Sequence, residues 1–141
     1  MTKLILIGFL CLASLFSKAQ SKDTVTRKTS IADSVFVRVE EEAMFPSGQQ
    51  AWLQYISGYL GRYYDKLTKA GDQGTCRVSF IVSKDGSVKD AEAMNMEGTL
   101  LAKVCVKAVM HSPKWQPARQ NGKVVNAYRV QPITFRIQVQ Q

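Results

Sequence analysis

The fold is decided by the stretch Cys76-Arg77-Val78-Ser79-Phe80-Ile81-Val82, which is followed by Asp85-Gly86. Apolar residues occupy every second position from Cys76 onward, and this period of two predicts a strand with one buried face. Asp-Gly suits a tight turn, because glycine accepts a positive φ. Val88 to Met94 is then the returning strand of a hairpin. Its apolar parity changes between Val88 and Ala91, which predicts a β-bulge.

Two more elements are predicted after this hairpin. Gly98-Thr99 opens a helix with an apolar face, and Ser112-Pro113 ends it. Asn121-Gly122 is a second hairpin signal, after which a strand runs from about Val124 to Val139. Pro132 lies inside this last strand, and a residue without an N–H group is tolerated mainly at a sheet edge. We therefore expect the last strand to lie at an edge.

A helix is also predicted before the first hairpin, beginning after Phe45-Pro46. Ser47 is positioned to cap it, and Gln50, three residues later, would complete a capping box. Apolar side chains then recur at helical spacing, and we interpret them as a core face rather than a ligand platform. These residues are Trp52, Tyr55, Ile56, Tyr59, Leu60 and Tyr63.

The chain before this helix divides into two segments. Residues 1–19 have the layout of a secretory signal peptide, with Lys3, an apolar run from Leu4 to Phe16, and small residues around the cleavage position. The run is shorter than the about 20 residues that span a membrane, so we expect cleavage after Ala19 and export. Residues 20–44 form a polar tail, in which Val35 to Val39 have strand propensity. The remaining residues, 45–141, form one domain.

Composition and residue inventory argue against several classes of protein. The 141 residues are 45% hydrophobic, enough for a core, and the net charge of +8 comes from scattered basic residues. We therefore expect no nucleic-acid partner. His111 is the only histidine, and we expect it to cap a helix end. No catalytic series, phosphate loop or metal-ligand spacing can be assembled, so we expect no enzyme, cofactor, metal site or direct small-molecule substrate.

The cysteines leave two interpretations open. Cys11 lies in the expected signal peptide, so export would leave Cys76 and Cys105, an even pair in an oxidising compartment. These two cysteines could form a disulfide. The interpretation that we favour is two small buried hydrophobic residues, because a bridge needs Cα atoms closer than about 7 Å.

Five motifs follow one another in a fixed order. They are Gly74 to Val82 with Asp85-Gly86-Ser87-Val88, Leu101 to Val109, Pro113-Lys114-Trp115-Gln116-Pro117-Ala118, Asn121-Gly122-Lys123, and Pro132-Ile133-Thr134-Phe135. Each motif alone is common, but the series over residues 45–138 resembles the C-terminal domain of TonB. The resemblance implies an α+β fold, a two-layer sandwich with two helices on one face of a three-stranded antiparallel sheet.

The same resemblance implies a mode of binding. Domains of this family add a short extended segment, the TonB box of an outer-membrane transporter plug, to the edge of their last strand. The family often has Tyr-Pro near this partner, where the present chain has Tyr63-Tyr64. The partner-binding residues that the resemblance implies are Tyr128, Val130, Gln131, Ile133, Thr134, Phe135, Ile137, Tyr63 and Tyr64.

One departure from the family shapes the expected function. Energy-transducing TonB proteins resemble a rod with an inner-membrane helix and a long proline-rich spacer, whereas Gln20 to Val35 contains no proline. We therefore expect a periplasmic binding module that captures an extended peptide in TonB-dependent transmembrane transport. Its partner would be the plug of an outer-membrane transporter or another envelope protein.

Two alternatives to this function stay open. One is an energy transducer anchored in the inner membrane by an uncleaved helix within residues 1–19. The other is an envelope domain that forms a homodimer through its edge strand.

Overall fold

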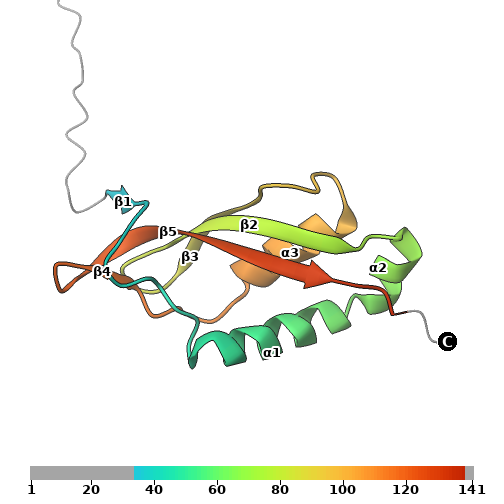
Figure 1. The fold of residues 1–141 in the computed structure, drawn as a ribbon, viewed down its shortest axis with the longest axis horizontal. Coiled ribbons are helices and arrows are strands. Elements are labelled where there is room, and N and C mark those ends of the chain that lie inside the picture. Colours follow the sequence, from blue (N-terminus) through green and yellow to red (C-terminus); the bar gives the residue numbers. More distant parts are fainter. Residues whose placement is uncertain (1–33, 139–141) are drawn as a thin grey trace, which may run out of the picture.

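Two long strands form the middle of the sheet in the computed structural model, which describes residues 34–138. β2 (Gly74–Val82) pairs antiparallel with β5 (Lys123–Phe135) along its whole length, from Gly74↔Phe135 to Val82↔Ala127. β3 (Val88–Ala93) pairs antiparallel with the other side of β2. The strand order is β1-β5-β2-β3, and Figure 1 shows β5 and β2 side by side along the length of the molecule.

The β2–β3 hairpin contains the predicted bulge. Ser79 pairs with Glu92, whereas Ile81, two residues on, pairs with Lys89, so β3 holds one extra residue. Asp90 lies in the extra step and has a left-handed φ of 50°. After the bulge, the positions of β3 whose side chains face the core change from even to odd numbers. This explains why the apolar residues shift by one position between Val88 and Ala91.

Two short strands enlarge the sheet beyond the expected three. β1 (Val35–Phe36) pairs parallel with Asn126 and Ala127, and β4 (Ala118–Gln120) pairs antiparallel with residues 123–125. The α+β class is confirmed, but the sheet has five strands and is mixed rather than wholly antiparallel. β1 lies within Val35 to Val39, where strand propensity is predicted, and β4 and β5 form a hairpin around the Asn121-Gly122 turn signal. The expected three-stranded sheet includes neither short strand. The parallel pairing of β1 with β5 leaves no signal in the sequence pattern, because a strand of two residues is too short to show a period of two.

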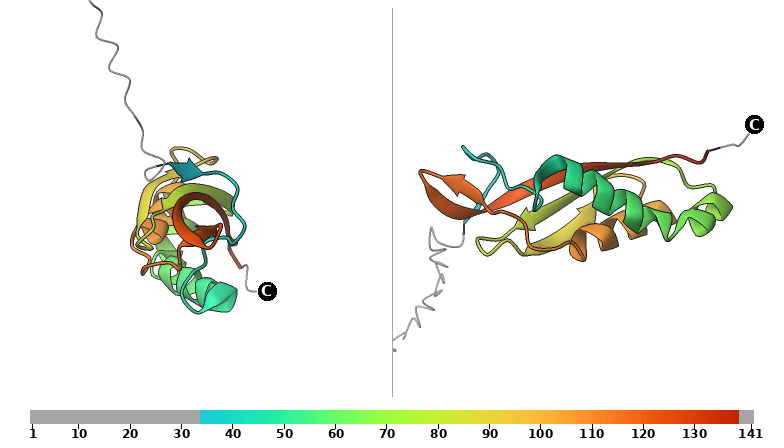
Figure 2. Two further views of the ribbon diagram at one scale, coloured as in Figure 1. Left: turned by 90° about the vertical axis from the view of Figure 1, so that its left-hand side faces the viewer. Right: turned by 90° about the horizontal axis from the view of Figure 1, so that it is seen from below.

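Three helices, rather than two, pack with the sheet. α1 (Gly48–Gly61) is followed at once by the short α2 (Tyr64–Ala70), and α3 (Leu100–Met110) follows β3. α3 lies behind β2 and β3, while α1 runs beside β5 (Figures 1 and 2). The helices thus form one layer, and the opposite face of the sheet carries no helix from residues 34–138.

The ends of the helices follow the sequence only in part. The Thr99 hydroxyl accepts a hydrogen bond from the Ala102 N–H (3.1 Å), so α3 begins with the expected cap. His111 ends α3, as expected. The capping box at α1 is wrong, because Ser47 has a left-handed φ of 65° and its side chain makes no capping bond to the described chain.

The core lies between the helices and the sheet and is rich in aromatic rings. Trp115 contacts Phe80 (5.1 Å between ring centroids), Trp52 (5.4 Å) and Phe45 (5.6 Å). Four members of the predicted stripe on α1 are buried there, namely Trp52, Ile56, Tyr59 and Leu60. The stripe is therefore a core face.

Residues just before α1 also pack on the sheet. Ala43 is fully buried, and Glu41 and Met44 pair with Arg119 and Gln116. Residues 1–19, the expected signal peptide, and residues 20–33 of the expected tail lie outside the described residues. Within residues 34–138, no helix has the length and apolar character needed to cross a bilayer.

Candidate functional site: the open edge of β5

β5 has paired strands near its start, but along its C-terminal part it pairs on one side only, with β2. β1 and β4 pair with residues 123–127, and β2 pairs with residues 127–135. On the side away from β2, no strand within the described part of the chain pairs with residues 128–135. We call this side of residues 128–135 the open edge.

The pairing pattern shows which backbone groups face the open edge. The Arg77 N–H donates to Asn95 Oδ1 and the Arg77 carbonyl accepts from the Met94 N–H (both 2.7 Å), so Arg77 faces β3. Bonding direction alternates along an antiparallel strand. Pro132, opposite Arg77, therefore directs its carbonyl away from β2, to the open edge. By the same parity, Val130 and Thr134 each direct an N–H and a C=O there, and Tyr128 directs its C=O there. The Tyr128 N–H points to the same side but faces Phe36 of β1, which pairs with Ala127.

Side chains along β5 alternate in the complementary way. Gln131, Ile133 and Phe135 are buried on the helix face. The side chains of Tyr128 and Val130 point to the other face of the sheet and are 46% and 39% exposed. A strand added at the open edge would continue both faces, because its side chains would alternate in the same way.

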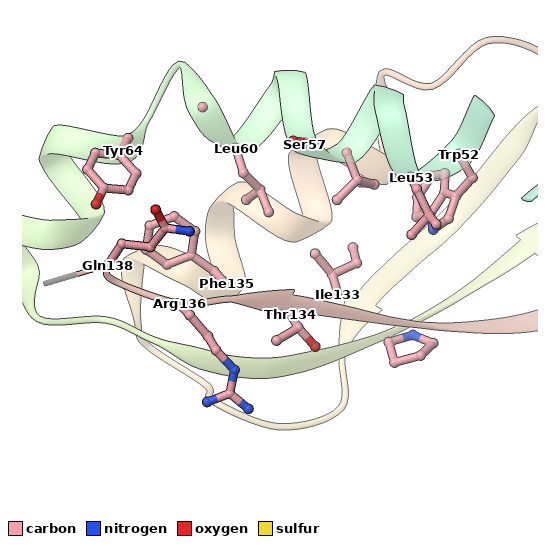
Figure 3. Close-up of a pocket in the computed structure, with 13 residues that line it drawn as sticks. Trp52, Leu53, Ser57, Leu60, Tyr64, Ile133, Thr134, Phe135, Arg136 and Gln138 are labelled. Carbon is pink, nitrogen blue, oxygen red and sulfur yellow. The ribbon is translucent and has the colours of Figure 1, made fainter. Parts of the chain in front are cut away.

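A groove of about 650 Å³ lies between α1 and the C-terminal half of the open edge. Figure 3 shows α1 and β5 running side by side in the same direction, with Leu60 and Ile133 pointing into the space between them. We call this space the α1–β5 groove. It is lined by Trp52, Leu53, Ile56, Ser57, Leu60, Gly61, Tyr64, Pro132, Ile133, Thr134, Phe135, Arg136 and Gln138.

The lining is mostly apolar and carries a positive charge at one end. Tyr64 packs edge-on against Phe135, with 5.7 Å between ring centroids, and closes the end of the groove beyond α1. Arg136 lies at this end and is the only charged residue among the described lining residues. At the other end of the open edge, Arg129 forms an ion pair with Glu42 (3.1 Å).

The second edge of the sheet differs in character. β3 carries Lys89, Asp90 and Glu92 in a six-residue strand, and the bulge at Asp90 interrupts its regular pairing direction. Charges and bulges are common protections of an edge against pairing with another chain. The open edge of β5 has neither a bulge nor a charged side chain between Val130 and Phe135.

The structure brings together only part of the implied partner-binding set. Ile133, Thr134, Phe135 and Tyr64 line the groove. Gln131 is buried in the core layer, and Ile137 lies beyond the end of β5, where its N–H donates to Gln73 Oε1 (3.3 Å). Tyr63 points elsewhere and stacks on Tyr59, with 5.9 Å between ring centroids.

Part of the wall that α1 contributes was missed by the sequence interpretation, although Trp52, Ile56 and Leu60 of the predicted stripe also line the groove. Leu53, Ser57 and Gly61 lie one turn apart along this wall. The available signal was Leu53, a large apolar residue that falls outside the predicted core stripe and is 51% exposed. Ser57 and Gly61 give no signal of their own, because small residues on a helix surface are ordinary.

The two cysteines lie away from the groove. Cys76 on β2 and Cys105 on α3 are fully buried free thiols. Burial raises the pKa of both thiols, and the neighbouring Cys76 raises that of Cys105 further. Neither is therefore an activated nucleophile. No cluster of three metal-ligating side chains occurs within residues 34–138.

The fold and the groove define a small α+β domain with an open strand edge beside an apolar groove. A family model described as Gram-negative bacterial TonB protein C-terminal matches residues 61–137, more than half of the chain. The chain therefore belongs to the TonB C-terminal family. This family consists of binding or transducer domains that interact with envelope proteins such as outer-membrane transporters, so membership indicates a TonB-like role in transport in the cell envelope. No curated protein and no solved structure matched the chain.

Proposed function

We propose that this protein is a non-enzymatic, periplasmic binding module that captures an extended peptide by strand addition at the open edge of β5. The peptide would be the TonB-box-like segment of an outer-membrane transporter. The observation that carries this proposal is the open edge itself, where residues 128–135 direct six backbone donors and acceptors away from both β2 and β1. In strand addition, hydrogen bonds to such backbone groups supply most of the binding affinity, and side-chain pockets supply the selectivity.

The adjoining groove supports the same proposal. A guest strand lies about 4.8 Å from β5 and needs an apolar surface for its inward side chains. The α1–β5 groove offers that surface directly beside Pro132 to Phe135. The β3 edge offers charges and a bulge instead, so the two edges are not equivalent.

The test is a titration of the full chain with a TonB-box peptide, followed by amide chemical shifts. We expect the largest shifts in residues 128–135 and on α1. A Val130→Pro variant should keep the β2–β5 ladder, because the Val130 N–H points to the open edge, yet should bind the peptide about fivefold or more weakly. Gln131→Pro is the matched contrast, since its N–H bonds β2 and its loss should unfold the domain. Shifts that avoid β5, or equal binding by Val130→Pro, would refute strand addition there.

Self-association is a second candidate that the same edge favours. Two copies could pair their open edges across a two-fold axis, because an open edge can pair with another chain. Light scattering over a range of concentrations separates the two functions. A monomer that binds peptide supports capture, and a dimer that Val130→Pro dissociates supports self-association.

A further inference from the structure

We propose that the α1–β5 groove selects its guest at one end, by a bulky apolar side chain that fits against Gly61 and a neighbouring carboxylate that pairs with Arg136. This inference rests on the proposed strand addition and specifies the chemistry of the guest. It concerns the end of the groove where Tyr64, Phe135 and Arg136 meet.

The first step is a match of spacing. Leu53, Ser57 and Gly61 follow one another at four-residue intervals, which is about 6 Å along a helix. Alternate residues of a strand are about 6.6 Å apart. Since α1 and β5 run in the same direction, three successive inward side chains of a guest would each meet one of these positions (Figure 3).

The second step is a gradient of size along this wall. Leu53 is large, Ser57 is small and Gly61 has no side chain. A Cβ atom placed on Gly61 would meet nothing within 4 Å. The wall of α1 therefore leaves most room at Gly61, beside the packed rings of Tyr64 and Phe135. Aromatic walls favour a bulky apolar or aromatic side chain. The Leu53 end favours a smaller one.

The third step is charge on the other face. Figure 3 shows Thr134 and Arg136 pointing to the same side of β5, away from α1. In a guest strand, the neighbour of the residue that faces Gly61 points to this side too, because side chains alternate. An acidic residue at that neighbouring position would reach the one charged lining residue of the groove.

The probes are eight-residue peptides that alternate threonine with valine, long enough to span residues 128–135. The first peptide begins with aspartate and then phenylalanine, which places both residues at the Gly61 end if the guest runs antiparallel to β5. The second peptide ends with phenylalanine and then aspartate, which places them at the same end if the guest runs parallel to β5. Controls replace phenylalanine by alanine or aspartate by lysine. We expect one of the two directions to bind the full chain about tenfold more tightly than its alanine control.

Two variants on one helix make the matched comparison. Gly61→Leu should fill the groove and remove the preference for phenylalanine, with about tenfold weaker binding. Gly58→Leu should leave binding unchanged, because Gly58 also has open space around its Cβ position but does not line the groove. Arg136→Glu should reverse the preference between the aspartate and lysine peptides.

The outcomes distinguish this inference from the function on which it rests. If the peptides shift the amides of β5 but bind alike regardless of phenylalanine, aspartate and Gly61→Leu, strand addition stands and the selection is overturned. If no peptide perturbs β5, both fail. If Gly58→Leu weakens binding as much as Gly61→Leu does, the effect comes from the helix as a whole and the selection is again overturned.

Discussion

At the scale of single residues, Pro132 sets how many hydrogen bonds the open edge can make. Its position is one of four whose backbone faces away from β2, and it offers a carbonyl without an N–H. The edge is therefore one donor short at its centre. Such a gap weakens pairing with any passing strand and leaves the groove to supply the remaining selectivity.

Replacing this proline tests the idea directly. Pro132→Val should add one N–H to the open edge and tighten peptide binding about two- to tenfold, the usual worth of one hydrogen bond. Because the added donor serves any guest, self-association should rise as well. Peptide titration and light scattering measure the two effects. Unchanged values for both would mean that the backbone at residue 132 does not face a guest.

Asp85 shows how a turn residue can respond to pH. The Ser87 hydroxyl (2.6 Å), then the Ser87 N–H (3.1 Å) and more weakly Lys114, lower the pKa of Asp85 from 3.8 to about 2. A lowered pKa means that the ionised group stabilises the folded state above pH 3.8, and that this contribution is lost as pH falls through about 2.

Ser87→Ala should therefore raise the pKa of Asp85 toward 3.8 and flatten the loss of stability between about pH 4 and pH 2. A titration of the carboxyl carbon by NMR measures the pKa. Lys114→Ala is the comparison and should produce a smaller rise, since its ion pair is long and exposed. A larger effect from Lys114 would reverse the assigned causes.

At the scale of elements, long periodic segments could be predicted from the sequence. The hairpin of β2 and β3, its bulge and α3 follow from alternation, turn chemistry and the Thr99 cap. β1 lies within the segment of predicted strand propensity, but its pairing with β5 could not be predicted, because the partner residues are far away in the sequence. The hairpin of β4 and β5 follows from the Asn121-Gly122 turn signal. α2 could not be predicted, because seven residues are too few to show a helical period. Part of the α1 wall of the groove was missed as well, because Ser57 and Gly61 acquire meaning only when β5 lies opposite them.

The turn between β2 and β3 is held against the segment that precedes β4. Gly86 has a φ of 83°, and its carbonyl accepts the Trp115 N–H at 2.8 Å. An added Cβ atom would lie 2.1 Å from the Trp115 carbonyl oxygen. Gly86→Ala should therefore combine backbone strain with a forced separation of two elements.

We expect Gly86→Ala to lower the free energy of unfolding by about 3 kcal/mol or more. Gly122→Ala is the matched control, because Gly122 has a similar φ of 71° but nothing within 4 Å of its Cβ position. That variant should lose only about 1 kcal/mol, the cost of the left-handed conformation. Chemical denaturation measures both losses, and equal values would show that the contact with Trp115 is unimportant.

At the scale of the whole molecule, the cysteine pair reports on opening of the core. Cys76 and Cys105 come from the two layers and are both fully buried, so a reagent reaches them only when the layers separate. Their raised pKa values slow the reaction with a thiol reagent further, because the thiolate is the reactive form.

In a Cys11→Ser background, we expect no reaction of the folded protein with a thiol reagent at pH 8 and two reactive thiols after denaturation. Labelling during unfolding by heat should follow the loss of structure. Fast labelling of the folded protein would contradict the burial, and no reactive thiol after denaturation would show that the pair has been oxidised to a disulfide.

The parallel pairing of β1 with the start of β5 also has a mechanical consequence. Ser34, where the described chain begins, lies at one end of the long axis, and residues 128–135 extend along that axis toward the other end (Figure 1). Inter-strand hydrogen bonds are perpendicular to the strands. If a pulling force acted on Ser34 while a guest strand was held at the far end of β5, the force would therefore run along the strands. It would shear the hydrogen bonds between β5 and the guest. All the bonds would share the load and fail together, rather than being peeled off one after another.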